Sequence, residues 1–126
     1  MKKIIQTNDA PSPIGPYNQA VQVGNIVYTS GQVALNPATG NLEVESIETE
    51  TEQVMQNLKA VLTAANTNFE NVVKTTIFIT DMANFSKINA VYGKYFDEAT
   101  APARETVQVA GLPRGVNIEI SMMAIV

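Results

Sequence analysis

Residues 101–125 read APARETVQVAGLPRGVNIEISMMAI and combine two strand-like runs with a turn between them. The turn signal is Leu112–Gly115, where Pro and Gly occupy positions that favour a chain reversal. If these four residues form the turn, Gly111 pairs with Val116 and pairing continues outward from there. The stretch therefore predicts an antiparallel hairpin.

In this register the hairpin has one apolar and one polar face, because side chains alternate across a strand. The apolar face would hold Val107, Val109, Ile118, Ile120, Met122 and Ala124. The polar face would hold Arg104, Thr106, Gln108, Glu119 and Ser121. A one-residue slip would exchange the two faces. The polar set places a guanidinium and a carboxylate among neutral hydrogen-bonding groups, so it either faces water or forms a polar site.

Length and composition predict one globular domain spanning residues 1–126. A chain of this size buries roughly two thirds of its unfolded surface, and its 45% hydrophobic content is ordinary for a folded protein. The charged share of 16% is below the usual quarter. A surface with few charges favours an oligomer, in which copies of the chain cover one another.

Charge and residue usage exclude several classes of function. The net charge is −4 and the eight Lys and Arg residues are scattered, whereas a nucleic-acid binder needs clustered positive charge. The absence of Cys and His excludes disulfides, Cys nucleophiles, Ser-His triads, and zinc or iron sites built from these residues. No apolar run is long enough to span a membrane, and no signal-peptide core is present. We therefore expect a soluble, cytoplasmic protein.

The order of elements predicts an α+β fold. Short strands are expected at 2–6, 19–23 and 26–30, the last two joined by the hairpin signal Gly24-Asn25. A helix capped by Ser46 runs to about Ala65, and the acids between Glu43 and Glu52 suit its positive end better than a metal site. A β-branched strand at 72–80, a helix at 84–96 and the final two strands complete the order β-ββ-α-β-α-ββ.

Two helices on one face of a mixed sheet are the expected layers. One layer of helices covers a single face of the sheet. We therefore expect the other face to contact either water or another subunit.

Each candidate site residue has a structural and a functional interpretation. Arg104 is either a surface arginine paired with Glu119 or a planar fork that holds a ligand carboxylate by two hydrogen bonds. Glu119 is either a satisfied strand residue or a group that positions a water molecule and shuttles its proton. Tyr17 and Ser30 can simply satisfy loop and hairpin backbones, and Asn89 can be an exposed helix position. Gly31 follows a strand at a point where a bulge or a ligand can approach the backbone.

Five stretches add a family resemblance: IGPY at 14–17, TSGQ at 29–32, VKTTIFI at 73–79, NAVY at 89–92, and PAR at 102–104 continued by VQVAGLP at 107–113. In order and spacing they resemble the Rid family (formerly YjgF), and most closely its RidA branch of 2-iminobutanoate/2-iminopropanoate deaminases. The resemblance covers nearly the whole chain without large insertions.

The resemblance implies a chorismate-mutase-like fold and a homotrimer, with a central barrel and with sites in the clefts between subunits. It also implies that short 2-imino acids, released by pyridoxal-phosphate enzymes, are hydrolysed to 2-keto acids and ammonia without cofactor or metal. By matching position, Arg104 is similar to the carboxylate-binding arginine and Glu119 to the residue that holds the attacking water. Tyr17, Ser30, Gly31, Asn89 and Thr106 fall at substrate-binding positions of the cleft.

The chain departs from the family pattern at two positions beside Arg104. Thr106 stands where many members have Cys, so a required thiol is excluded. Glu105 replaces a common Ser, and strand alternation should point it away from Arg104. Two other functions stay open: a non-catalytic sensor or regulator that binds small carboxylic acids in the same cleft, and the ribonuclease activity attached to some relatives. The acidic balance argues against the ribonuclease.

Overall fold

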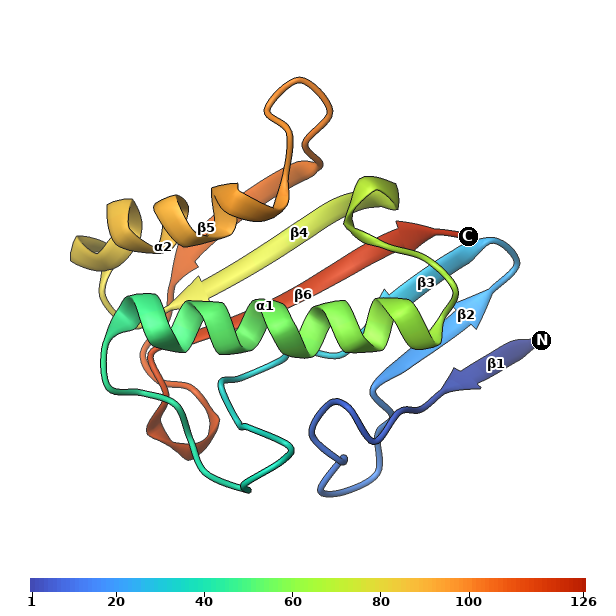
Figure 1. Cartoon of the computed structure of the whole chain (residues 1–126), viewed down its shortest axis with the longest axis horizontal. Helices are drawn as coiled ribbons and strands as arrows, with labels where there is room; N and C mark the ends of the chain where they lie inside the picture. Colours follow the sequence, from blue (N-terminus) through green and yellow to red (C-terminus); the bar gives the residue numbers. More distant parts are fainter.

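The structure, a computed structural model, describes all 126 residues and forms one six-stranded mixed sheet with two helices on one face (Figure 1). The strand order is β1-β2-β3-β6-β4-β5. The predicted α+β class and the order β-ββ-α-β-α-ββ are both confirmed. The elements are β1 Lys2–Ile5, β2 Ala20–Val23, β3 Ile26–Thr29, α1 Ile47–Ala64, β4 Val72–Ile79, α2 Phe85–Tyr92, β5 Ala103–Gln108 and β6 Ile118–Ile125.

The first hairpin forms as the sequence predicts. Val23 pairs with Ile26 across the turn, and the backbone N–H of Ser30 donates to Gln19 O at 2.9 Å. Gly24 adopts a φ of 59°, a left-handed conformation that Gly reaches without strain. A two-residue turn of this kind matches the twist of the flanking strands, so local sequence fixes this register.

Helix α1 covers the centre of the sheet with an apolar stripe. Its N-terminus is capped by Ser46, whose hydroxyl accepts from Thr49 N at 3.0 Å. Val54, Leu58 and Leu62 are fully buried and recur at helical spacing. They pack in one core cluster with Ile77, Ile118 and Ile120 of the sheet.

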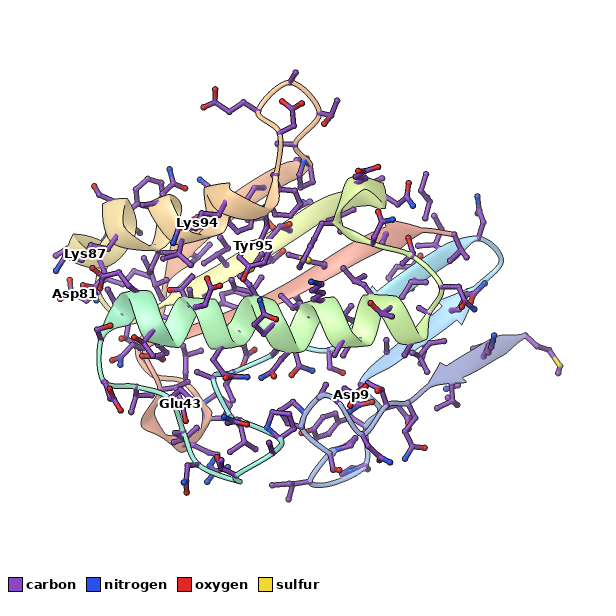
Figure 2. All side chains as sticks on the ribbon, viewed as in Figure 1. Asp9, Glu43, Asp81, Lys87, Lys94 and Tyr95 are labelled. Carbon is purple, nitrogen blue, oxygen red and sulfur yellow. The ribbon has the colours of Figure 1, made fainter.

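Tyr95 ties the segment after α2 to α1. Its hydroxyl donates to Glu52 Oε1 at 2.6 Å and accepts from Gln56 Nε2 at 2.8 Å, and Figure 2 shows it between the two helices. Burial raises the pKa of Tyr95 to about 12, and the hydrogen bond to Glu52 acts in the same direction. The helix layer is therefore joined by a polar contact as well as by its apolar core.

The predicted hairpin of the last two strands is wrong. Leu112–Gly115 does form a turn, with Gly115 N donating to Leu112 O at 3.1 Å, but β5 and β6 are not neighbours. β4 lies between them, antiparallel to β6 and parallel to β5. α2 provides the crossover that a parallel β4–β5 pair requires.

This topology also changes which residues share a face. Arg104 pairs with Thr75, and Thr75 pairs with Met122, which is buried beneath the helices. Thr106 and Gln108 pair with the buried Ile77 and Ile79, so they join Arg104 on the helix side of the sheet. Glu119 and Ser121 alternate with buried β6 residues and lie on the opposite face, together with Val107. The predicted polar face shared by Arg104 and Glu119 therefore does not exist within the chain.

The face opposite the helices exposes apolar side chains. Ile4, Val21, Tyr28 and Met123 form one row across four strands. Ile4, Tyr28 and Val107 keep more than two fifths of their surface accessible. Large apolar groups gathered on one exposed face usually mark a contact surface. None of the helices is both long and apolar enough to cross a bilayer.

Candidate functional site

Glu119 lies in a cleft of about 530 Å³ on the side of the sheet away from the helices. The cleft is also lined by Tyr17, Ser30, Gly31 and Arg114. These residues come from the loop before β2, the end of β3 and the turn before β6. The structure therefore gathers four of the residues predicted for the site: Tyr17, Ser30, Gly31 and Glu119.

Gly31 is required by the position of the Glu119 side chain. A Cβ atom added at Gly31 would lie 2.6 Å from Glu119 Cδ and 2.8 Å from Glu119 Cγ, closer than van der Waals contact allows. The neighbouring Gln32 exchanges backbone hydrogen bonds with Ile120 at 2.8 and 3.1 Å. Glu119 thus rests directly against the backbone, as a glycine after a strand predicts.

The loop that carries Tyr17 is shaped by a buried glutamine. Gln19 Nε2 donates to Thr7 O, Ala10 O and Pro11 O, while Gln19 Oε1 accepts from Thr7 N at 2.8 Å. Ser30 Oγ donates to Asn18 O at 2.6 Å. The serine hydroxyl therefore anchors the loop, as its structural interpretation predicts, and Oγ still lines the cleft as an acceptor.

Tyr17 contributes an exposed phenol to the same cleft. Its oxygen accepts from Ile14 N at 3.3 Å, so its hydroxyl proton is free to donate.

Burial raises the pKa of Glu119 above its ordinary value. The carboxylate forms no ion pair within the chain, where Lys74–Glu105 is the only pair. A carboxylate in a partly dry cleft, without an ion-pair partner, is a stronger base than one in water. Glu119 is therefore suited to accept a proton from a bound water molecule.

Arg104 lies in a second cleft, of about 420 Å³, lined by Asn89, Tyr92, Phe96 and Glu98 among others. Asn89 Oδ1 accepts from Arg104 Nη1 at 2.6 Å. The guanidinium carbon also lies 5.0 Å from the ring centroid of Tyr92 and 5.7 Å from that of Phe85. α2 thus holds the fork by one hydrogen bond and two aromatic rings, and leaves its remaining donors available.

Tyr92 is itself fixed by the sheet. Its hydroxyl donates to Thr75 Oγ1 at 3.0 Å, and burial raises its pKa. Thr106 lies two residues along β5 on the same side as Arg104. Glu105 points to the opposite face, where it accepts from Thr76 Oγ1 at 2.7 Å and pairs with Lys74 Nζ at 3.1 Å. The predicted outward direction of Glu105 is confirmed.

The two clefts share no residue. One holds Glu119 on the open face, and the other holds Arg104 at the edge beside α2. No group of His, Cys, Asp or Glu residues is arranged to hold a metal ion.

Comparison with known proteins places the chain in a family. Residues 7–126 match the family described as Endoribonuclease L-PSP. The chain belongs to the Rid (YjgF) family.

Individual Rid relatives agree over nearly the whole chain. It is 46% identical to the 2-iminobutanoate/2-iminopropanoate deaminase of Mus musculus, over 99% of this chain and 92% of that protein. It superimposes on RidA from the Antarctic bacterium Psychrobacter with a TM-score of 0.93 and 41% identity, covering 98% and 99% of the two chains. It also matches E. coli TdcF, solved with bound serine, with a TM-score of 0.92 and 42% identity over 98% of each chain.

Tyr92 and Arg114 are among the cleft residues of this Rid chain that the sequence does not predict for the site. Tyr92 was noted as part of a motif, but its ring beneath Arg104 depends on the pairing of β5 with β4. Arg114 was assigned only to a turn. Its positive φ of 61° sets it apart from an ordinary turn residue. Residue types do not predict this dihedral angle, so the sequence holds no signal for a role of Arg114 in the cleft.

Proposed function

We propose that this Rid protein hydrolyses short 2-imino acids, such as 2-iminobutanoate and 2-iminopropanoate, to 2-keto acids and ammonia. The observation that carries the proposal is Arg104, an arginine held in a cleft by Asn89 and Tyr92 with no carboxylate partner of its own. A positioned guanidinium with free donors matches a substrate carboxylate. The mouse relative named as such a deaminase supports the choice of substrate.

The proposed chemistry needs few protein groups. A 2-imino acid is already electrophilic at C2, especially when its nitrogen is protonated. Water adds to C2 as Glu119 accepts its proton, which forms a carbinolamine. The nitrogen then takes up a proton, which replaces the one that Glu119 removed from water. The C–N bond breaks, ammonia leaves, and the hydroxyl group loses its proton as the carbonyl of the 2-keto acid forms. Orientation by Arg104 and proton transfer by Glu119 therefore account for the reaction without a cofactor or a metal.

We also propose that the complete site forms between copies of the chain in a homotrimer. Arg104 and Glu119 lie on opposite sides of one sheet and in separate clefts, so one chain does not present both to one small molecule. The exposed apolar row of Ile4, Val21, Tyr28 and Met123 supports burial of the open face by other subunits, as in a central barrel.

The test couples an enzyme that makes 2-iminobutanoate from threonine to this protein and follows 2-ketobutyrate in amine-free buffer. Wild type should accelerate ketoacid formation. Arg104→Ala should reduce kcat/KM by roughly 10²- to 10⁴-fold, because two charge-assisted hydrogen bonds are lost. Lys87→Ala is the matched control, since it removes a positive charge from the exposed side of α2 (Figure 2) and should leave activity unchanged. Full activity in Arg104→Ala would refute the mechanism.

A second candidate function is binding without turnover. E. coli TdcF was solved with bound serine, which shows a small amino acid held by a relative. A regulator of this kind would bind small carboxylic acids, would not accelerate imine hydrolysis, and would tolerate Glu119→Gln. Wild type and Glu119→Gln should each be titrated calorimetrically with 2-ketobutyrate and also run in the coupled assay. Binding without any acceleration of imine hydrolysis would favour the regulator.

Ribonuclease activity is not proposed for this chain, although the family's description includes it. The chain has no His and a net charge of −4. Lys87 of α2 lies near Asp81 (Figure 2), and Lys94, which follows α2, lines a hollow together with Glu43, Glu48 and Glu52. A groove that follows a phosphate backbone would need clustered positive charge there.

A further inference from the structure

Glu50 is a fully buried acidic side chain that the proposed reaction does not use. It lies near the start of α1. Its carboxylate reaches across to the start of β6, where it accepts from Asn117 N at 2.7 Å, Asn117 Nδ2 at 2.8 Å and Ile118 N at 3.2 Å. All its hydrogen bonds therefore go to two consecutive residues that precede Glu119.

These three bonds are needed because burying a carboxylate is costly unless hydrogen-bond donors surround it. Glu50 has no cationic partner, since the only ion pair in the chain joins Lys74 to Glu105. The donors fill three of the roughly four acceptor sites of the group. The attachment to Asn117–Ile118 is thus the whole of Glu50's polar environment.

The attached segment connects two parts of the lining of the Glu119 cleft: Pro113 and Arg114 precede it, and Glu119 follows it. The turn before it carries Arg114, which lines that cleft. Asn117 is also held from its other side, because Thr80 N donates to Asn117 O at 3.1 Å. Asn117 is therefore fixed between the end of β4 and the start of α1.

Glu119 has no comparable support of its own. Its carboxylate forms no hydrogen bond or ion pair with the chain and rests against Gly31. Its position is consequently set by the backbone of β6, which pairs with Phe78 of β4 at Glu119 itself. Just before Glu119, the same backbone is held by Glu50 at Asn117–Ile118.

We propose that Glu50 is a positioning residue for the reaction: by holding Asn117–Ile118 it keeps Glu119 in place for the attacking water. The proposal rests on the proposed function. It requires an acceptor at position 50 that reaches the two backbone N–H groups, and it does not require a negative charge there.

Glu50→Leu tests this requirement, because leucine fills the space but leaves the donors without a partner. Provided that it folds, kcat should fall about 10- to 10²-fold, the size expected for a displaced reacting group. KM should change little, because Arg104 stands on β5 beside α2. Glu50→Gln should restore kcat to within about threefold of wild type, since its amide oxygen can still accept from the backbone. Glu48→Leu, the same change at an exposed position of the same helix turn, should behave as wild type.

A second readout does not depend on activity. The carboxyl carbon of Glu119 can be followed by NMR in protein labelled with ¹³C-glutamate, and Glu119→Gln assigns the signal. Burial raises the pKa of Glu119, and the other ionisable groups lining its cleft are Tyr17 and Arg114. In Glu50→Leu a looser segment admits water, so the pKa of Glu119 should fall toward its ordinary value. A purely structural role would lower stability but leave this titration unchanged in the folded protein.

The outcomes separate the two proposals. An inactive wild type would refute the deaminase, while the shift in the Glu119 titration would still test Glu50. A folded Glu50→Leu protein with wild-type kcat and wild-type titration would overturn the positioning role. If Glu50→Leu does not fold, Asn117→Ala decides. It removes only the side-chain donor and should lower kcat by about threefold at unchanged KM, and wild-type kcat in that variant would overturn the proposal.

Discussion

At the scale of the residue, the burial that suits Glu119 to act as a base also lowers the stability of the folded chain at neutral pH. Its pKa is raised by burial from the ordinary 4.5, so the folded chain binds this proton more tightly than the unfolded chain. Between the ordinary and the raised pKa, stability therefore falls as pH rises, and the loss persists above the raised value. Folding of the single chain at neutral pH leaves a charged carboxylate in a cleft where the chain itself offers it no ion-pair partner.

Glu119→Gln should consequently be inactive but no less stable. We expect kcat to fall by about 10²- to 10⁴-fold, the usual contribution of a general base. The melting temperature at pH 7 should equal or exceed that of wild type, and the difference should shrink as pH falls through the raised pKa of Glu119 toward 4.5. Wild-type kcat should decline as pH decreases through the raised pKa of Glu119. Thermal melts and rates at matched pH values check this, and a Glu119→Gln protein clearly less stable at pH 7 would contradict it.

Gly31→Ala tests the contact beneath Glu119. The added Cβ would lie 2.6 Å from Glu119 Cδ, so the carboxyl must move into the cleft. We expect a loss of about 1–3 kcal/mol in the free energy of unfolding, as in other overpacked sites, and a fall in kcat of roughly 10-fold or more. Gly111→Ala is the control, because its Cβ would meet no atom within 4 Å. Equal effects of the two substitutions in urea titrations and rate assays would refute the role of Gly31.

At the scale of the element, local signals predicted the parts and missed one neighbour relation. Gly24-Asn25 fixed the register of β2 and β3 because a two-residue turn leaves adjacent strands no alternative. The sequence predicts the turn at Leu112–Gly115 equally well. A turn reverses the direction of the chain, but it does not determine whether the strands before and after it pair with each other. β4, eight residues long and paired on both sides, inserted between β5 and β6. That choice depends on long-range pairing, so sequence reasoning placed Arg104 and Glu119 on one face when they lie on two.

The contact between α1 and the segment that follows α2 can be tested through Tyr95. Tyr95→Phe removes the hydrogen bonds to Glu52 and Gln56 and should cost about 1 kcal/mol of unfolding free energy at pH 7. In wild type the folded chain retains the Tyr95 proton up to a pKa of about 12, while an unfolded tyrosine loses it near 10. Wild-type stability should therefore decrease as pH rises from about 10 to about 12, and Tyr95→Phe should lack this component. Parallel stability curves for the two proteins across this range would contradict the assignment.

At the scale of the whole molecule, the two clefts and the open sheet face have one common explanation. Each cleft holds half of what the proposed reaction needs: Arg104 for the carboxylate, and Glu119 for the water. The open face exposes apolar groups that a second copy would cover. In the proposed assembly each site lies between two copies, one of which supplies Arg104 and the other Glu119. The same contact between neighbours would therefore complete every site. Closed cyclic symmetry of this kind joins unlike surfaces of identical chains.

This assembly makes complementation between inactive variants the decisive prediction. Arg104→Ala retains Glu119, and Glu119→Gln retains Arg104. In a ring where each cleft takes one residue from each of two neighbours, an equal mixture assembled from unfolded chains should recover about a quarter of wild-type activity, because about one cleft in four receives both native residues. Each variant refolded alone should stay inactive, as should variants mixed after folding, before subunits exchange. Light scattering should give the mass of a trimer for all samples. If both residues acted within one chain, no mixture would gain activity, because no chain would carry both.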